Sequence, residues 1–347
     1  MAKLWRRSAK GEQGTSGLVE IDTAGLHITR PTVIFLSGFF TQDSTPQHVR
    51  TAMRNIKGLL PAVDPAPEVL VYSHKDLKDI FNVAAYSIEP EARFCKAAKK
   101  LAGGVIMPLV AKDFKLNDDG SVTGTPLQLD EAKKNLRNIT FFGYSAGTIT
   151  AQECFNASLK MMRDVGYKED DARAALAEVV NIGVGVMSQP KKEKNRFTTL
   201  SLEATNDKLV LFKNRLWEPL RALFTNFAHK LKIEPLSETS AVITAAVNKK
   251  DWETREKDGK TVKERVKSLL PKWMLVKSFH ELPRYVTQDE QLSPFAKIVH
   301  YSLANAVTRK ERIAPLDLMQ PPANTEEKTS AAYREKISKA WIKPPKK

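Results

Sequence analysis

The feature that most constrains this chain is a short apolar run that leads straight into a serine flanked by glycines. Residues 138–142 read Asn-Ile-Thr-Phe-Phe, residues 143–147 read Gly-Tyr-Ser-Ala-Gly, and a helical pattern follows. This order predicts an apolar strand, a sharp turn and a helix. Such a turn strains the backbone of the residue at its apex, and only small residues two before and two after it let strand and helix pack closely. The pattern therefore predicts that Ser145 projects its hydroxyl above the edge of a sheet, at the N-terminus of a helix.

Two interpretations of Ser145 are open at this point. Backbone N–H groups and the positive end of the helix dipole favour negative charge, which suits a serine nucleophile beside a developing oxyanion. The alternative is an ordinary strand-to-helix turn of a doubly wound sheet, with the serine hydroxyl capping the helix. Because the pentapeptide also occurs by chance, residues elsewhere in the chain must decide.

Two further candidates follow strand-like segments downstream of the serine. Residues 197–203 are β-branched and alternating, and the pattern breaks so that Asp207 falls in a turn; residues 273–279 read as another strand, which delivers His280 into a loop. A serine, an acid and a histidine that each follow a strand are predicted to converge on one edge of a sheet. Glu203 is the alternative acid, but inside a strand its side chain has less freedom to reach a loop histidine.

The order serine, acid, histidine resembles that of the α/β-hydrolase superfamily, over roughly residues 17–305. The resemblance rests on short motifs and element order, and it points to no particular member. It implies an α/β fold with a mostly parallel central sheet flanked by helices. It also implies Ser145 as the nucleophile, His280 as general base and then general acid, and Asp207 as the group that fixes the imidazole tautomer.

A loop in the first half of the chain fits the same scheme. Residues 31–36 form a short apolar run typical of a strand buried on both faces, and Ser37 and Gly38 follow it. Members of the superfamily often have His-Gly at this point, so Ser37 stands in place of the histidine. We expect the backbone N–H groups of Phe39 and Ala146 to donate to the oxyanion, because main-chain donors do not depend on the side chain. Gly38 has an alternative interpretation as an ordinary strand-to-loop glycine.

Gly38 and Tyr144 are predicted to contact the substrate. His74 also follows a candidate strand and is a further candidate contact at the same edge, although a surface loop position is the simpler interpretation. The remaining histidines either precede the serine, against the order of the superfamily, or lie in helical patterns: His27, His48, His229 and His300.

One large α/β domain with an insertion accounts for a chain of 347 residues. We predict a flexible N-terminus at 1–16, the α/β domain at 17–310, and a tail at 311–347 with a short helix near 331–342. Between the acid and the histidine lie more residues than one crossover helix needs. Residues 212–271 are therefore predicted to hold a helix and then, from 236, a lid or side insertion before the last core strand.

Charge and cysteine content limit the binding partners and the cellular compartment that the sequence predicts. A formal net charge of +15, spread along the chain, favours acidic partners such as a phosphate-bearing acyl thioester or an anionic membrane surface, although a plain solvated basic surface fits equally well. Zinc spacings, phosphate-cradling loops and RNA-binding fingerprints are missing from the sequence, so neither a metal, a cofactor nor a nucleic acid is predicted. Two cysteines far apart, and no apolar run of membrane-spanning length, predict a cytoplasmic protein.

Together these patterns predict a serine hydrolase that cleaves an ester or thioester through an acyl-enzyme. An acyltransferase would use the same residues with another acceptor than water. A third alternative, from a different class, is a binding protein that keeps the fold for its basic surface and leaves Ser145 idle.

Overall fold

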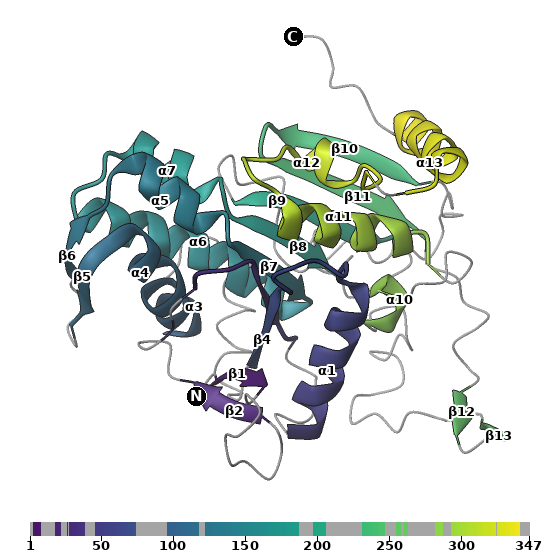
Figure 1. Ribbon diagram of the computed structural model, residues 1–347, viewed down its shortest axis with the longest axis horizontal. Coiled ribbons are helices and arrows are strands. Elements are labelled where there is room, and N and C mark those ends of the chain that lie inside the picture. Colours follow the sequence, from purple (N-terminus) through teal and green to yellow (C-terminus); the bar gives the residue numbers. More distant parts are fainter. Residues whose placement is uncertain are drawn as a thin grey trace, which may run out of the picture.

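The computed structural model describes residues 3–7, 18–21, 26, 28–38, 46–73, 96–117, 122–186, 197–205, 231–246, 255–257, 260–262, 282–286, 293–323 and 325–340. A nine-stranded, mostly parallel sheet runs through the molecule with helices on both of its faces (Figure 1). This arrangement confirms the mixed α/β class and the mostly parallel, helix-flanked sheet that the sequence predicts.

Six neighbouring strands of the sheet are parallel to one another. In spatial order they are β11 (Ser240–Ala245), β9 (Thr198–Ala204), β8 (Val180–Val184), β7 (Ile139–Tyr144), β3 (Thr32–Leu36) and β4 (Glu68–Ser73). Antiparallel strands complete the edges: β10 (Lys232–Ser237) beside β11, and β1 (Lys3–Arg7) followed by β2 (Leu18–Ile21) beside β4. Every residue of β3 and β8 is buried, and both strands are mostly apolar, with Thr32 and Asn181 as the polar exceptions.

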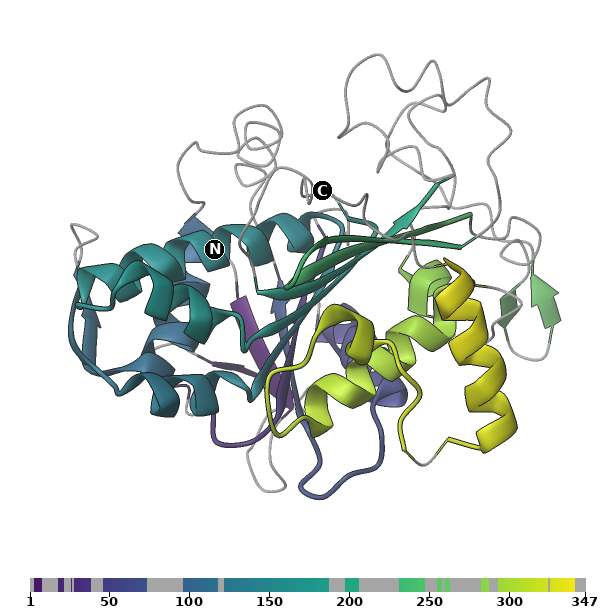
Figure 2. The same cartoon turned by 90° about the horizontal axis from the view of Figure 1, so that it is seen from above.

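Helices cover the two faces of the sheet in separate groups (Figure 2). One group consists of α3 (Lys96–Leu101), the π-helical turn η2 (Ala102–Ile106), α4 (Met107–Val110), α5 (Leu129–Leu136), α6 (Ala146–Asp164) and α7 (Glu169–Leu176). The other consists of α1 (Pro46–Leu59), α10 (Pro283–Val286), α11 (Ala296–Thr308), α12 (Pro315–Leu318) and α13 (Glu327–Ala340). Two small hairpins lie outside the main sheet: β5 (Ala111–Leu116) with β6 (Val122–Pro126), and β12 (Arg255–Lys257) with β13 (Lys260–Val262). Within the described ranges, no helix is long and apolar enough to cross a membrane.

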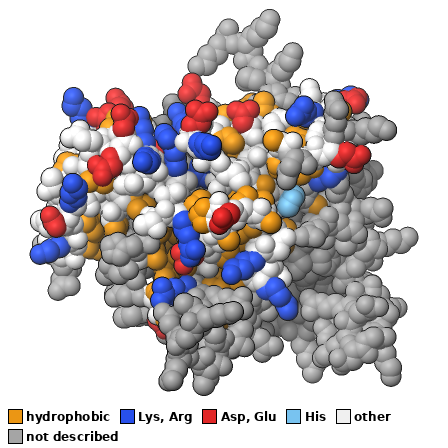
Figure 3. Space-filling model, in the orientation of Figure 1, with side chains coloured by type: hydrophobic (Ala, Val, Ile, Leu, Met, Phe, Trp, Pro, Cys, Tyr) orange, Lys and Arg blue, Asp and Glu red, His pale blue; other side chains and the backbone are white. Residues whose placement is uncertain are grey.

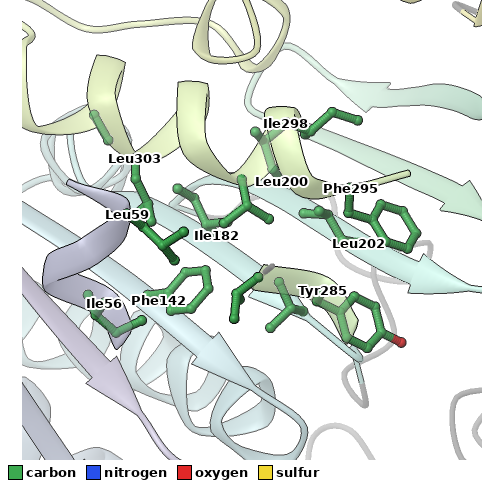
Figure 4. Close-up of a cluster of buried hydrophobic side chains, with 14 of the residues drawn as sticks. Ile56, Leu59, Phe142, Ile182, Leu200, Leu202, Tyr285, Phe295, Ile298 and Leu303 are labelled. Atoms are coloured by element: carbon green, nitrogen blue, oxygen red, sulfur yellow. The ribbon is translucent and has the colours of Figure 1, made fainter. Parts of the chain in front are cut away.

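The sheet separates two apolar cores, and alternate residues of each strand enter opposite ones. In β7, Phe142 packs on Phe35 with ring centroids 5.9 Å apart in the core under α11, part of which Figure 4 shows. Phe141, one residue earlier, packs on Phe197 at 5.4 Å in the core under α6. The central strands are therefore packed on both faces. This packing also fixes the direction in which the chain leaves each strand.

The N-terminal segment differs from the prediction for residues 1–16. Residues 3–7 form β1, which pairs with both β4 and β2, and Leu4 is buried. Residues 3–7 contain three positive charges and have little β pattern of their own. The pairing partners, far away in the sequence, supply the order.

Part of the predicted lid also belongs to the sheet. Residues 232–245 form the hairpin of β10 and β11, and β11 pairs in parallel with β9 over its whole length. Pro235 is tolerated because β10 is an edge strand that needs only one neighbour. The apolar run at 241–246 is thus a buried strand within a charged stretch of sequence, and not a cover over the sheet. The last core strand expected at 273–279 lies outside the described residues.

A half-buried arginine fastens α11 to the amino-terminal edge of the sheet. The Arg309 guanidinium donates to the carbonyls of Ile139 (2.8 Å), Glu178 (3.1 Å) and Ala306, and to the hydroxyl of Thr140 (3.2 Å). Burial lowers the pKa of Arg309 to about 9, which leaves the group charged at neutral pH.

Removal of the Arg309 guanidinium should destabilise the fold. We expect Arg309→Met to lower the free energy of unfolding by about 3 kcal/mol, because buried carbonyls lose their donors. Arg173→Ala, which breaks an exposed ion pair with Glu169 on α7, should change it little. Urea unfolding followed by circular dichroism compares the two variants, and equal stabilities would show that the Arg309 contacts are not needed.

Candidate active site

Ser145 is the single residue between the end of β7 and the start of α6. Its backbone has φ 53° and ψ −120°, a combination that costs a residue with a side chain about 1–3 kcal/mol. The Ser145 side chain makes no capping hydrogen bond to α6. The strained turn predicted from the sequence is therefore present, whereas the capping role in the alternative interpretation is not.

Three hydrogen bonds hold the Ser145 backbone in this conformation. Its N–H donates to the Val184 carbonyl at the end of β8 (3.0 Å). Its carbonyl accepts from the backbone N–H of Thr148 (3.0 Å) and from the Thr148 hydroxyl (2.6 Å), both in the first turn of α6. The strained residue is thus bonded to the sheet on one side and to the helix on the other.

The two glycines of the motif are required by the close approach of α6 to the sheet. A Cβ on Gly147 would lie 2.1 Å from the carbonyl oxygen of Leu36 in β3. A Cβ on Gly143 would lie 3.2 Å from the backbone of Gly147 and from that of Thr148. No real Cβ fits the first position, and the second is tight. The requirement for small residues on both sides of Ser145 is confirmed in the contacts themselves.

The loop that follows β3 lies directly against Ser145. A Cβ on Gly38 would lie 2.9 Å from the Ser145 Cβ and 3.3 Å from the ring of Tyr144. Three of the predicted site residues, Gly38, Tyr144 and Ser145, are thus brought together at the carboxyl edge of the sheet. The Ser37 N–H extends the ladder by donating to the Tyr72 carbonyl (3.0 Å), and its buried hydroxyl has no hydrogen-bond partner among the residues that the structure describes. Phe39 lies outside the described residues.

Asp207, His280 and His74 also lie outside the described residues, but the chain is described to within two residues of the first two. Thr205 donates to the Ala245 carbonyl (2.8 Å), so the ladder between β9 and β11 continues to that point. Glu203, the alternative acid, is half-buried in β9 opposite Thr244. Beyond the histidine the chain resumes at Leu282 and forms α10.

Tyr285 of α10 is a residue of this edge that the sequence did not reveal. Its fully buried ring stacks on Phe295 with centroids 5.4 Å apart (Figure 4). Its hydroxyl accepts a hydrogen bond from the Ala204 N–H (3.3 Å). The sequence around Tyr285, a single tyrosine after a proline, contains no pattern that predicts this hydrogen bond. Thr148 was missed as well, although a threonine three residues past a turn is a common partner of the turn carbonyl.

In the described part of the chain, the other histidine, cysteine and acidic side chains do not form an alternative catalytic site. His300, predicted on a helix, lies in α11, where its Nδ1 is 2.9 Å from the Leu59 carbonyl of α1. Burial raises the pKa of the Cys154 thiol in α6 to about 12, so this thiol stays protonated and unreactive at neutral pH. Among the residues described, no cluster of three or more His, Cys, Asp or Glu side chains is placed to hold a metal ion.

Comparison with known proteins adds no assignment to this geometry. The sequence matches no protein-family model, and the search of curated proteins found no significant match.

The contact between α6 and β3 can be tested at Gly147. We expect Gly147→Ala to lower the free energy of unfolding by more than about 3 kcal/mol, or to prevent folding, because the new methyl group overlaps a backbone carbonyl. Gly58→Ala in α1 is the matched control, since a Cβ there meets no atom of the described residues within 4 Å. It should be neutral or stabilising by up to about 1 kcal/mol. Urea unfolding of both variants decides, and a Gly147→Ala protein as stable as the control would contradict the close contact.

Proposed function

We propose that this protein is a serine hydrolase of the α/β-hydrolase type, which cleaves an ester or thioester with Ser145 as its nucleophile. The observation that carries the proposal is the strained Ser145 backbone, with φ 53° and ψ −120°, between β7 and α6. The Ser145 hydroxyl does not cap the helix, and backbone strain of this kind clusters at functional sites.

The order of the strands supports the proposal. β3 and β7 are parallel neighbours, with Leu36 opposite Gly143, so the loop at Gly38 and the turn at Ser145 leave the sheet side by side. β9, which leads toward Asp207, is separated from β7 by β8 alone. All these strands run in one direction, so the chain leaves each of them at the same edge of the sheet, the edge at which α/β proteins bind their ligands.

The proposed reaction begins when His280 takes the proton of the Ser145 hydroxyl and the oxygen attacks the acyl carbon. The oxyanion that forms accepts hydrogen bonds from the N–H groups of Ala146 and Phe39. Ala146 is the first residue of α6, where backbone N–H groups have no partner within the helix. His280 then protonates the departing alcohol or thiol, and water activated by His280 releases the acyl group. Asp207 holds the imidazole in the required tautomer.

An acyltransferase is the second candidate because it differs only in the acceptor that replaces water. Both candidates fit a substrate with a negatively charged leaving group, given the net charge of +15. On the face shown in Figure 3, however, lysine and arginine side chains are interspersed with acidic ones, which favours no single large anionic partner there.

Labelling by a fluorophosphonate probe tests whether Ser145 is an activated nucleophile. We expect the purified protein to be labelled and to hydrolyse short p-nitrophenyl and thioester substrates, and we expect Ser145→Ala to abolish both signals. Ser158→Ala, which removes a buried hydroxyl from the same helix, should leave them unchanged. A folded protein that is neither labelled nor active, like its Ser145→Ala variant, would refute the proposal and favour the binding-protein alternative.

The choice of acid is tested by two isosteric substitutions. Asp207→Asn should reduce kcat by about 10³–10⁴-fold, because the histidine loses the carboxylate that fixes its tautomer. Glu203→Gln should leave kcat nearly unchanged. The reverse outcome would move the role of the acid from Asp207 to Glu203 while leaving the serine mechanism in place.

A further inference from the structure

The Tyr285 hydroxyl bonds a backbone N–H of β9 that would normally pair with the neighbouring strand β8. β8 pairs with β9 as far as Val184 opposite Leu202, and the Gly185 N–H makes the last contact with the Leu202 carbonyl (3.1 Å). Gly185 then turns away from the sheet with φ 58°. In a parallel ladder the next β9 amide to face β8 is that of Ala204. Because β8 has left, the Tyr285 hydroxyl accepts this N–H instead, at 3.3 Å.

Packing alone does not explain a tyrosine at this position. The ring is fully buried and stacked on Phe295, a role that phenylalanine would fill with the same ring and no polar group to bury. Figure 4 shows the ring beside Leu202 and Phe295, at the carboxyl end of β9. Relative to phenylalanine, tyrosine adds one hydroxyl group, and this hydroxyl is hydrogen-bonded to the end of β9.

The location of the bond suggests what the oxygen is for. Ala204 precedes Asp207 by three residues, and Tyr285 follows His280 by five. The hydrogen bond therefore joins the strand that leads into the proposed acid to the short helix that follows the proposed base. Ser145 is close to the same point, since its N–H is bonded to Val184, the residue opposite Leu202.

We propose that Tyr285 is a positioning residue of the catalytic site, whose hydroxyl fixes α10, which follows His280 in the chain, against the end of β9, which precedes Asp207. The inference rests on the proposed function. Tyr285 takes no part in bond making and acts only through the two residues that it aligns.

The test is Tyr285→Phe in the full chain, with Tyr167→Phe as the matched control. Tyr167 also uses a hydroxyl to bind backbone, the carbonyls of Val110 (2.8 Å) and Leu127 (2.7 Å), but it lies past the far end of α6 from Ser145. For each variant we would measure the unfolding midpoint, kcat and KM for a p-nitrophenyl ester, and the dependence of kcat/KM on pH.

Both variants should unfold at a lower urea concentration than the wild type, but only Tyr285→Phe should lose activity. We expect its kcat to fall about tenfold or more with KM unchanged, because small displacements of catalytic groups are costly. The acidic limb of its pH profile should move to lower pH, since a carboxylate that is less well placed raises the histidine pKa less.

The outcomes separate this inference from the function on which it rests. If Tyr285→Phe matches Tyr167→Phe in kcat and pH profile while the wild type remains active through Ser145, the positioning role is wrong and the hydrolase stands. If the wild type itself shows no activity that depends on Ser145, the proposed function fails, and the positioning role fails with it.

Discussion

The approach of α6 to β3 is the contact on which the carboxyl edge of the sheet depends. At Gly147 the helix backbone comes so close to the Leu36 carbonyl that no side chain fits between them. A helix pressed this tightly onto the sheet leaves one residue, Ser145, in which the chain must reverse from strand to helix. The positive φ at Ser145 is the geometric consequence, and the bonds to Val184 and Thr148 keep it there.

The two edges of the sheet are stabilised by different means. At the amino-terminal edge, two half-buried arginines bind the strands: Arg309 donates to strand carbonyls, and Arg137 pairs with the buried Glu178 at 2.8 Å. At the carboxyl edge the strands end in loops, and a backbone group at a strand end is bonded by a single side chain, as the Ala204 N–H is by the Tyr285 hydroxyl. This division suits an α/β protein, in which one edge maintains the fold and the other is free to vary with the ligand.

The sequence predicted those parts of the fold that depend on neighbours along the chain. The strand, turn and helix around Ser145 were predicted because an apolar run and two glycines at fixed spacing are local requirements. That the loop at Gly38 lies beside Ser145 was implied by the resemblance to the α/β-hydrolase superfamily, and the contact between the two residues agrees with it. β1 and the hairpin of β10 and β11 were missed, because short strands gain their order from partners far away in the sequence. The convergence of Asp207 and His280 stays a prediction.

The bonding of the Ser145 backbone bears on which ligand this edge suits. In a turn that cradles a phosphate, backbone N–H groups point at the ligand and small residues let it approach. Here the Ser145 N–H already donates to β8, and the Ser145 carbonyl accepts from α6. The groups of the turn that can contact a ligand are therefore the Ser145 side chain and the first N–H groups of the helix. One hydroxyl beside such donors suits an anion that forms next to the hydroxyl during a reaction better than one that arrives preformed. For that reason the geometry of this turn agrees with the proposed acyl transfer, in which the anion forms beside the serine.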